Sequence, residues 1–164
     1  MAKSKLTKDI EYWFEIFLNS RWEDSINECT IDRYGIVDIL GRSQKIKRAK
    51  GKKPERENTW SCYEIKVSKQ DFYSKSKWTF VGHYNYFIMP RELYDVVKKD
   101  IPDNVGVYIA SYDNKNSMSF YSKKRAKRTK LKTSESTIVH EYIRSLYREH
   151  LKELKKEYRK RKMV

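Results

Sequence analysis

Apolar residues recur along this chain of 164 residues in two kinds of pattern, one typical of helices and one of strands. Residues 7–20 place apolar side chains three and four positions apart, which predicts an amphipathic helix with Thr7 as its N-cap. Short runs rich in aromatic and β-branched residues predict strands at 26–31, 35–40, 60–67, 84–89 and 105–111, with a short edge strand at 117–121.

The segments between these runs indicate how the strands are connected. Gly35 predicts a tight turn after the first strand, whereas residues 41–59 lack apolar periodicity and are expected to form a long loop. Helices are predicted at 68–80, about 90–100 and 134–162. Because helices follow the third and fourth strands, the sheet should be mixed and partly parallel. We therefore expect one α/β domain at 1–133, with a charged helix at 134–164 that packs on it or extends from it.

The positive charge is concentrated in two segments. The net charge is +15, and residues 42–56 and 123–132 each contribute +7. Such clustering favours a polyanionic partner, although a lysine-rich solvated surface is the alternative. The candidate nucleic-acid-binding residues are Lys45, Lys47, Arg48, Lys50, Lys52, Lys53, Lys77, Lys124, Arg125, Lys127 and Arg128.

Several classes of protein are disfavoured by what the sequence lacks. No apolar run approaches the ~20 residues that span a bilayer, so no membrane partner is expected. The first residues have no apolar signal-peptide core. Cys29 and Cys62 belong to no Cys/His cluster and are expected to be reduced core thiols. These features together predict a cytoplasmic protein.

An acidic residue followed two positions later by lysine occurs three times, and one occurrence stands out. Glu64-Ile65-Lys66 lies within an apolar strand, whereas the triplets that begin at Asp113 and Glu153 lie in a polar turn and on the charged tail helix. Residues two apart in a strand share a face, so the Glu64 and Lys66 side chains should project together. Charged groups in an apolar strand cost free energy unless they are paired or bind metal.

Asp38 lies between Val37 and Ile39 on a neighbouring predicted strand, and its carboxylate could share one cation with Glu64. The backbone carbonyl of Ile65 is a candidate third ligand. Oxygen ligands of this kind suit Mg²⁺, or Mn²⁺, rather than Zn²⁺. Such a cation activates water and neutralises charge on a phosphate, and Lys66 could stabilise the transition state. The same side chains could instead form a buried salt-bridge cluster without metal.

Other carboxylates are candidates for supporting roles. Glu28, on the first strand, could be a further metal ligand or a solvated edge residue. Glu11 and Glu15 on the first helix are rivals for that place, although a solvated helix position explains each of them. Asp71 could orient the site from behind Lys66, or simply cap the helix that begins at Ser68.

The spacing of these residues resembles the PD-(D/E)XK nuclease superfamily, and within it the MmcB-like DNA-repair proteins. The matching stretches run from Glu28 to about 111 and are Ile36-Val37-Asp38-Ile39, Glu64-Ile65-Lys66-Val67-Ser68, Asp71-Phe72, Lys77-Trp78, Tyr86-Phe87, Pro90, Ile101-Pro102, Gly106 and Ile109-Ala110. Val37 stands where the family tends to place an arginine, and the basic 42–56 segment looks like an insertion.

The resemblance implies a restriction-endonuclease-like fold, with a mixed sheet flanked by helices and catalytic residues Asp38, Glu64 and Lys66. It implies a Mg²⁺-dependent endo- or exonuclease that acts on DNA in repair, recombination or the processing of mobile-element or phage DNA, and the sequence leaves RNA open as the alternative substrate. A nucleic-acid-binding protein on the same fold, without catalysis, is the alternative. The sequence leaves the oligomeric state open, a homodimer included.

Overall fold

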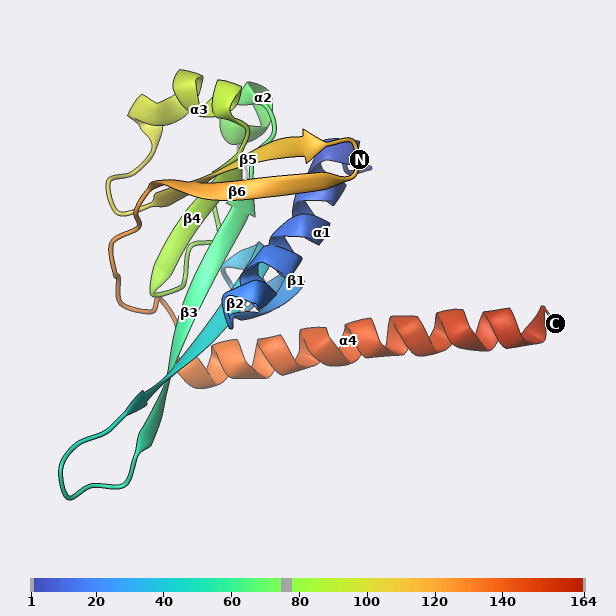
Figure 1. Cartoon of the computed structure of the whole chain (residues 1–164). Helices are drawn as coiled ribbons and strands as arrows, with labels where there is room; N and C mark the ends of the chain where they lie inside the picture. The colour runs from blue at the N-terminus through green and yellow to red at the C-terminus, as the bar shows by residue number, and fades with distance from the viewer. Residues whose placement is uncertain (1, 75–77, 164) are drawn as a thin grey trace.

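The chain folds around one six-stranded sheet with helices on both faces (Figure 1). The computed structural model describes residues 2–74 and 78–163. The elements are α1 (Lys5–Ser20), β1 (Asp24–Ile31), β2 (Gly35–Lys47), β3 (Glu55–Ile65), α2 (Lys69–Phe72), β4 (Tyr84–Met89), α3 (Arg91–Val97) with a 3₁₀ turn (Lys98–Asp100), β5 (Gly106–Asn114), β6 (Ser117–Lys124) and α4 (Glu135–Lys162).

The sheet is mixed, as the alternation of strands and helices predicts. Its order follows the chain from β1 to β6. The β3–β4 and β4–β5 pairs are parallel, and the other three pairs are antiparallel. The crossovers through α2 and α3 permit this, since parallel neighbours cannot be joined by a tight turn. The carboxyl ends of β3, β4 and β5 therefore lie at the same end of the sheet.

Two apolar clusters cover the two faces of the sheet. On one face, Ile10, Phe14 and Leu18 of α1 are buried against strand residues that include Ile39 and Tyr63. The other face packs against α2, α3 and the first turns of α4, through side chains that include Phe72, Leu93, Val97, Ile138 and Tyr142. No helix within the described residues is long and apolar enough to cross a membrane.

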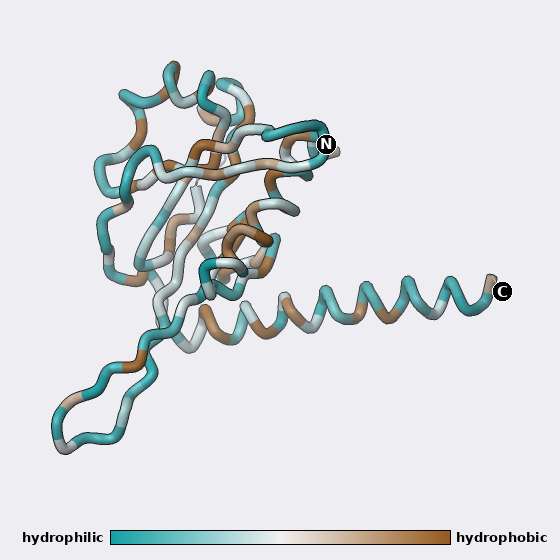
Figure 2. The backbone as a smooth tube through the Cα atoms, viewed as in Figure 1, coloured by the Kyte–Doolittle hydropathy of each residue, from teal (hydrophilic) through white to brown (hydrophobic). Residues whose placement is uncertain are grey.

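Two parts project from this body. From Lys152 to Met163 every residue of the chain is exposed, and the end of α4 extends away from the sheet (Figures 1 and 2). The β2–β3 hairpin projects at the opposite end of β3 from α2, and Figure 2 shows it almost entirely hydrophilic. The first half of α4 packs on β1.

Three expectations about local structure are wrong. Residues 41–59 are not an irregular loop, because β2 extends to Lys47 and β3 begins at Glu55, with backbone pairing between them. Of the described residues in the helix predicted at 68–80, only Lys69–Phe72 are helical, and Phe80 and Val81 are buried in the core. The N-cap of α1 is Ser4, whose hydroxyl accepts a hydrogen bond from the Thr7 N–H at 3.1 Å.

Candidate functional site

Asp38 and Glu64 meet on neighbouring strands. Ile39 pairs with Tyr63 in the antiparallel β2–β3 register, which places Asp38 beside Glu64. Their side chains are joined by a hydrogen bond, and Glu64 is only 6% exposed. Backbone donors hold both groups: the Ile65 N–H donates to Asp38 Oδ2 at 2.8 Å, and the Thr79 N–H donates to Glu64 Oε1 at 3.2 Å.

Burial raises the pKa of both carboxyls in this pair and so disfavours their ionisation. Burial, followed by the negative charge of Asp38, raises the pKa of Glu64 to about 8, although the Lys66 ammonium opposes the change. Burial also raises the pKa of Asp38, against the Ile65 N–H and the charges of Lys66 and Lys3. Two acids that share one desolvated site cannot both be charged cheaply, so the pair holds a proton at neutral pH or requires a cation.

Lys66 is buried next to the pair and is held by Asp71. It directly follows Ile65, the last residue of β3, and it is 6% exposed. Lys66 Nζ lies 3.6 Å from Asp71 Oδ1, while Asp71 Oδ2 accepts a hydrogen bond from the Val67 N–H at 3.3 Å. The Asp71 N–H also donates to Ser68 Oγ at 3.1 Å. Asp71 thus has both of the roles that the sequence left open: it belongs to the cap at the start of α2, and it forms an ion pair with Lys66.

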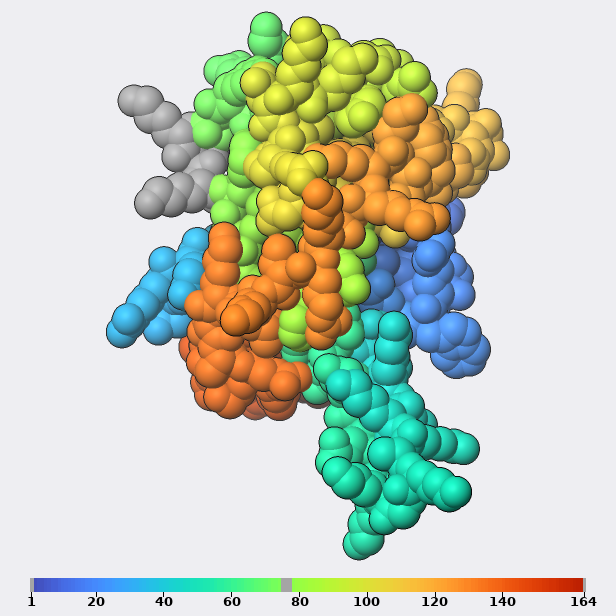
Figure 3. Space-filling view, turned by 90° about the vertical axis from the view of Figure 1, so that its left-hand side faces the viewer, coloured from blue at the N-terminus to red at the C-terminus, as the bar shows by residue number. Residues whose placement is uncertain are grey.

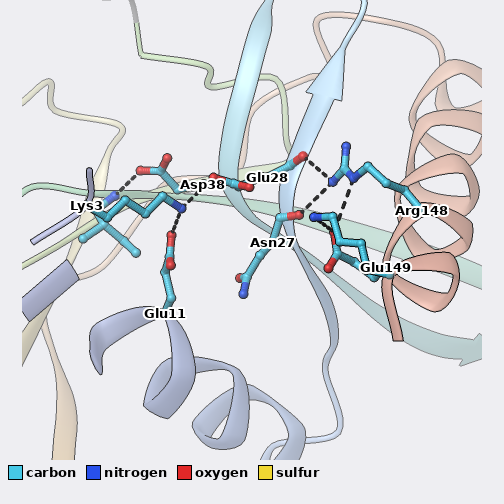
Figure 4. Close-up of polar contacts among 9 residues, drawn as sticks. Lys3, Glu11, Asn27, Glu28, Asp38, Arg148 and Glu149 are labelled. Carbon is cyan, nitrogen blue, oxygen red and sulfur yellow. Dashed lines mark hydrogen bonds and ion pairs between the residues drawn. The ribbon is translucent and has the colours of Figure 1, made fainter. Parts of the chain in front are cut away.

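Lys3 joins the acidic candidates around Asp38 (Figure 4). Its ammonium forms ion pairs with Glu11 and with Glu28, the latter at 2.7 Å, and its charge favours ionisation of Asp38. Glu28 is exposed and has a left-handed backbone, with φ of 52°, at an irregular point of the β1–β2 pairing. Glu15 instead bonds Asn27. Glu11 and Glu28 are therefore the carboxylates gathered on the Asp38 side.

Sequence reasoning did not identify Lys3. It lies before α1, in a segment with no periodicity, and its partner Glu28 is distant in sequence. A second connection also holds this region, because Arg148 of α4 donates to the Glu28 carbonyl oxygen at 2.9 Å (Figure 4). The only signal in the sequence was the acidic character of the partners themselves.

The donor set for a metal is small. Within residues 2–74 and 78–163, no three His, Cys, Asp or Glu side chains form a group that could hold a metal ion. Two carboxylates are present, so any cation here keeps most of its ligands as water. The role of the Ile65 carbonyl stays a prediction. An open groove of about 1030 Å³ lies between β1 and α4 and is lined by none of Asp38, Glu64 and Lys66.

The basic segment 42–56 belongs to the β2–β3 hairpin, and its charged residues do not border this site. Lys47 follows Asp38 by nine residues along β2, which corresponds to about 30 Å at the rise of a strand. Glu64 is next to the last residue of β3, whereas the hairpin turn precedes the first. The extended pairing carries the basic residues away from the carboxylates.

The second basic segment crosses the sheet near the amino ends of β4 and β5. The Thr129 N–H donates to the His83 carbonyl at 2.8 Å, and Lys127 N–H donates to the Asn104 carbonyl at 3.0 Å. Several of its cations have protein partners: Lys124 donates to the Pro102 carbonyl, Lys127 pairs with Asp103, and Arg128 lies 3.8 Å from Glu57. Arg125 is exposed, and Lys77 lies outside the described residues.

Comparisons with known proteins bear on the fold. No family model and no curated protein matches the chain. A solved structure of a protein of unknown function from Silicibacter pomeroyi is similar to it, with a TM-score of 0.64 and 17% sequence identity. The similarity covers 93% of this chain and 91% of the other. At this identity the match shows a shared fold alone.

Proposed function

We propose that this protein is a Mg²⁺-dependent nuclease that hydrolyses phosphodiester bonds in DNA. The observation that carries the proposal is the pairing of the half-buried Asp38 with the buried Glu64, with the buried Lys66 beside them. A cytoplasmic role in DNA repair, recombination or mobile-element DNA processing fits this activity. The resemblance of Glu64-Ile65-Lys66-Val67-Ser68 and Asp38 to the PD-(D/E)XK superfamily supports it from the sequence.

The arrangement of charges favours this reading over a salt-bridge cluster. Among the described residues, Lys66 forms its ion pair with Asp71 and with neither Asp38 nor Glu64. A buried carboxyl, Glu64, and a half-buried one, Asp38, therefore face one another without an ion-pair partner among the described residues. Burying them in this way is costly, and the protein holds both with backbone N–H donors. A site that binds a divalent cation accounts for that cost.

The donors present fit Mg²⁺ or Mn²⁺. Hard carboxylate oxygens are the ligands these ions prefer, and Mg²⁺ is usually bound by one or two carboxylates while it retains several waters. When bound, such an ion lowers the pKa of a coordinated water and neutralises charge on the scissile phosphate.

The protein's own groups would orient the reaction. The Ile65 and Thr79 N–H groups fix one oxygen each of Asp38 and Glu64, and they hold the two carboxyls side by side. Lys66, desolvated in the same site, is positioned to donate to a phosphate oxygen as negative charge develops on it. Asp71 acts through Lys66 and is a positioning residue.

The test combines metal binding with cleavage. Calorimetry with Mn²⁺ should detect binding by the wild type and its loss in Asp38→Asn, with Glu153→Gln on the exposed part of α4 as the matched control. Wild type should cleave at least one of single-stranded, duplex and branched DNA in the presence of Mg²⁺ or Mn²⁺. If it is inert on all three and on RNA with both ions, the enzyme proposal is overturned, and a non-catalytic nucleic-acid-binding protein becomes the better description.

A further inference from the structure

The outer part of the β2–β3 hairpin is a ribbon without a core. The strands remain paired from Ser43–Thr59 out to Lys47–Glu55. All thirteen residues from Gln44 to Arg56 are nevertheless exposed. Figure 3 shows this hairpin as a finger that extends beyond the body of the molecule. A hairpin alone is marginally stable in water at best, so a ribbon kept free on both faces is more readily explained by a partner than by folding.

The two faces of the ribbon carry different chemistry. Successive side chains alternate between faces, so Lys45 and Lys47 share one face with their cross-strand partners Glu57 and Glu55. That face is balanced in charge, and Lys47 Nζ lies 2.8 Å from Glu57 Oε2. Its lysines are thus less available to an external phosphate than their number suggests.

The opposite face has no acidic residue. It presents Gln44 opposite Asn58, and Ile46 opposite Arg56. Gln44 Nε2 donates to Asn58 Oδ1 at 3.0 Å, which leaves further donors and acceptors of both amides for a ligand. Ile46 is 56% exposed, although it is the one large aliphatic side chain of the ribbon. Two amides, one guanidinium and one aliphatic group form a surface able to make specific contacts.

The turn of the ribbon carries positive charge that no acidic residue within the turn neutralises. Residues 48–54 contain Arg48, Lys50, Lys52 and Lys53 and no acidic residue. Gly51 has a φ of 78°, a left-handed conformation that glycine adopts without strain, and it lies at the tip. The cations therefore surround the end of the ribbon, where they can reach phosphates on either side of a groove.

We propose that this hairpin enters the major groove of duplex DNA, with the Gln44–Ile46–Arg56–Asn58 face toward the base edges and the tip cations on the phosphates. The major groove of B-DNA, about 12 Å wide, admits a two-stranded β-ribbon. Arginine pairs with guanine, asparagine or glutamine with adenine, and apolar groups contact the thymine methyl. The major groove of A-form RNA is too deep and narrow for such contacts, which assigns duplex DNA as the partner.

This inference rests on the polyanion partner of the proposed function but does not require cleavage. Binding is therefore measured in EDTA, with the full chain, on a library of short DNA duplexes with a random central segment, and the bound fraction is sequenced. Wild type should enrich a short sequence. Arg56→Lys, which keeps the charge but loses the planar fork, should flatten the preference at one guanine by about tenfold, and Asn58→Ala should do so at another base.

Matched controls separate sequence-specific contacts to the bases from non-specific electrostatic binding to the phosphates. Lys45→Ala on the opposite face should leave the enriched sequence unchanged. Replacing the preferred guanine by 7-deazaguanine, which lacks the major-groove N7 acceptor, should weaken wild type by about tenfold and Arg56→Lys by much less. Lys45 and Arg56 are exposed, so the thermal midpoint of each of their variants should match wild type. A wild type that enriches no sequence, or binds an RNA duplex as tightly as DNA, overturns the inference and leaves the nuclease proposal untouched.

Discussion

The two ends of the β2–β3 pair differ in almost every physical respect. At one end, Glu64 is buried and Asp38 is half-buried, both accept hydrogen bonds from backbone donors, and the pKa of each is raised. At the other, the cations of residues 48–53 are exposed and lie beyond the last paired residues. Chemistry needs desolvated and fixed groups, whereas attraction of a polyanion needs solvated charge. The same two strands therefore provide both environments because they run from the core into solvent.

This separation predicts that catalysis and affinity respond to different substitutions. The largest effect is expected for Lys66→Ala, which should lower the cleavage rate by about 10²–10³ while DNA affinity changes little. Lys66 is one of 37 Lys and Arg residues, so its share of backbone binding is small. The measurement is single-turnover cleavage of the best DNA substrate alongside binding of the same DNA in EDTA.

The matched control is Lys155→Ala, which alters the same kind of triplet on the exposed part of α4. It should leave the rate at the wild-type value. A Lys66 variant that cleaves normally would remove the buried lysine from the chemistry, even if the carboxylates kept their role.

The next largest effect concerns the tip of the hairpin. Neutralising Lys50, Lys52 and Lys53 together should reduce the slope of log affinity against log salt by roughly three times 0.9, if all three meet phosphates of duplex DNA. Affinity at low salt should fall by about tenfold or more. The reason is that counterions released by these contacts drive binding. Fluorescence anisotropy over a series of salt concentrations measures the slope.

Neutralising Lys124, Lys127 and Arg128 gives a second slope for comparison. These side chains are engaged with Pro102, Asp103 and Glu57, so we expect a smaller reduction. Equal reductions would mean that the second basic segment releases its partners on binding, and an unchanged slope for the hairpin variant would exclude the tip from the interface.

The pH dependence of stability probes the carboxyl end alone. The pKa of Glu64 in the folded state, about 8, lies above its ordinary value of 4.5, so the folded state binds the proton more tightly than the unfolded state. Stability from this proton is complete below pH 4.5 and is lost as pH rises toward about 8. Glu64→Gln keeps a neutral side chain, so its free energy of unfolding should exceed that of wild type by on the order of 4 kcal/mol at pH 8 and match it at pH 4.

Urea unfolding at several pH values, without metal, measures this difference. Added Mg²⁺ should restore wild type at pH 8 and leave Glu64→Gln unaffected, because the variant lacks one ligand. A difference that is constant across pH would show that Glu64 does not titrate in this range, and the charged pair would then need another explanation.

The same contrast explains which features could be predicted from the sequence. The strand at 84–89 was located at its observed bounds because Tyr84–Met89 is buried in the sheet and reads as an apolar run. The Asp38–Glu64 juxtaposition followed from charged residues between apolar neighbours on paired strands. Both signals arise from burial, which constrains the choice of side chain strongly.

The missed features lack that constraint. Residues 44–56 are exposed on both faces of the ribbon, so no apolar alternation marks the strands, and backbone pairing alone maintains them. The helix predicted at 68–80 stops early because of tertiary contacts, in which Phe80 enters the core and the Thr79 N–H bonds Glu64. Lys3 reaches Glu28 across 25 residues of sequence, and no local pattern records such a contact.

The smallest expected effect concerns Lys3, whose positive charge lies near the Asp38 carboxylate and should influence metal binding there. The Lys3 ammonium is hydrogen-bonded to Glu11 and Glu28, contacts that raise its pKa against the cost of burial, so it stays charged at neutral pH. Its charge acts on Asp38 and should repel a divalent cation bound there. Because Lys3 is partly exposed, screening limits this repulsion, and Lys3→Ala should tighten Mn²⁺ binding by only about threefold. Calorimetry against a Lys5→Ala control measures the change, since Lys5 pairs with Asp9 instead.

Weaker binding in Lys3→Ala would mean that the lysine holds the acidic residues in place. If binding tightens, adding Glu11→Gln or Glu28→Gln to that variant identifies which freed carboxylate joins the metal, because only the loss of that ligand should reverse the gain.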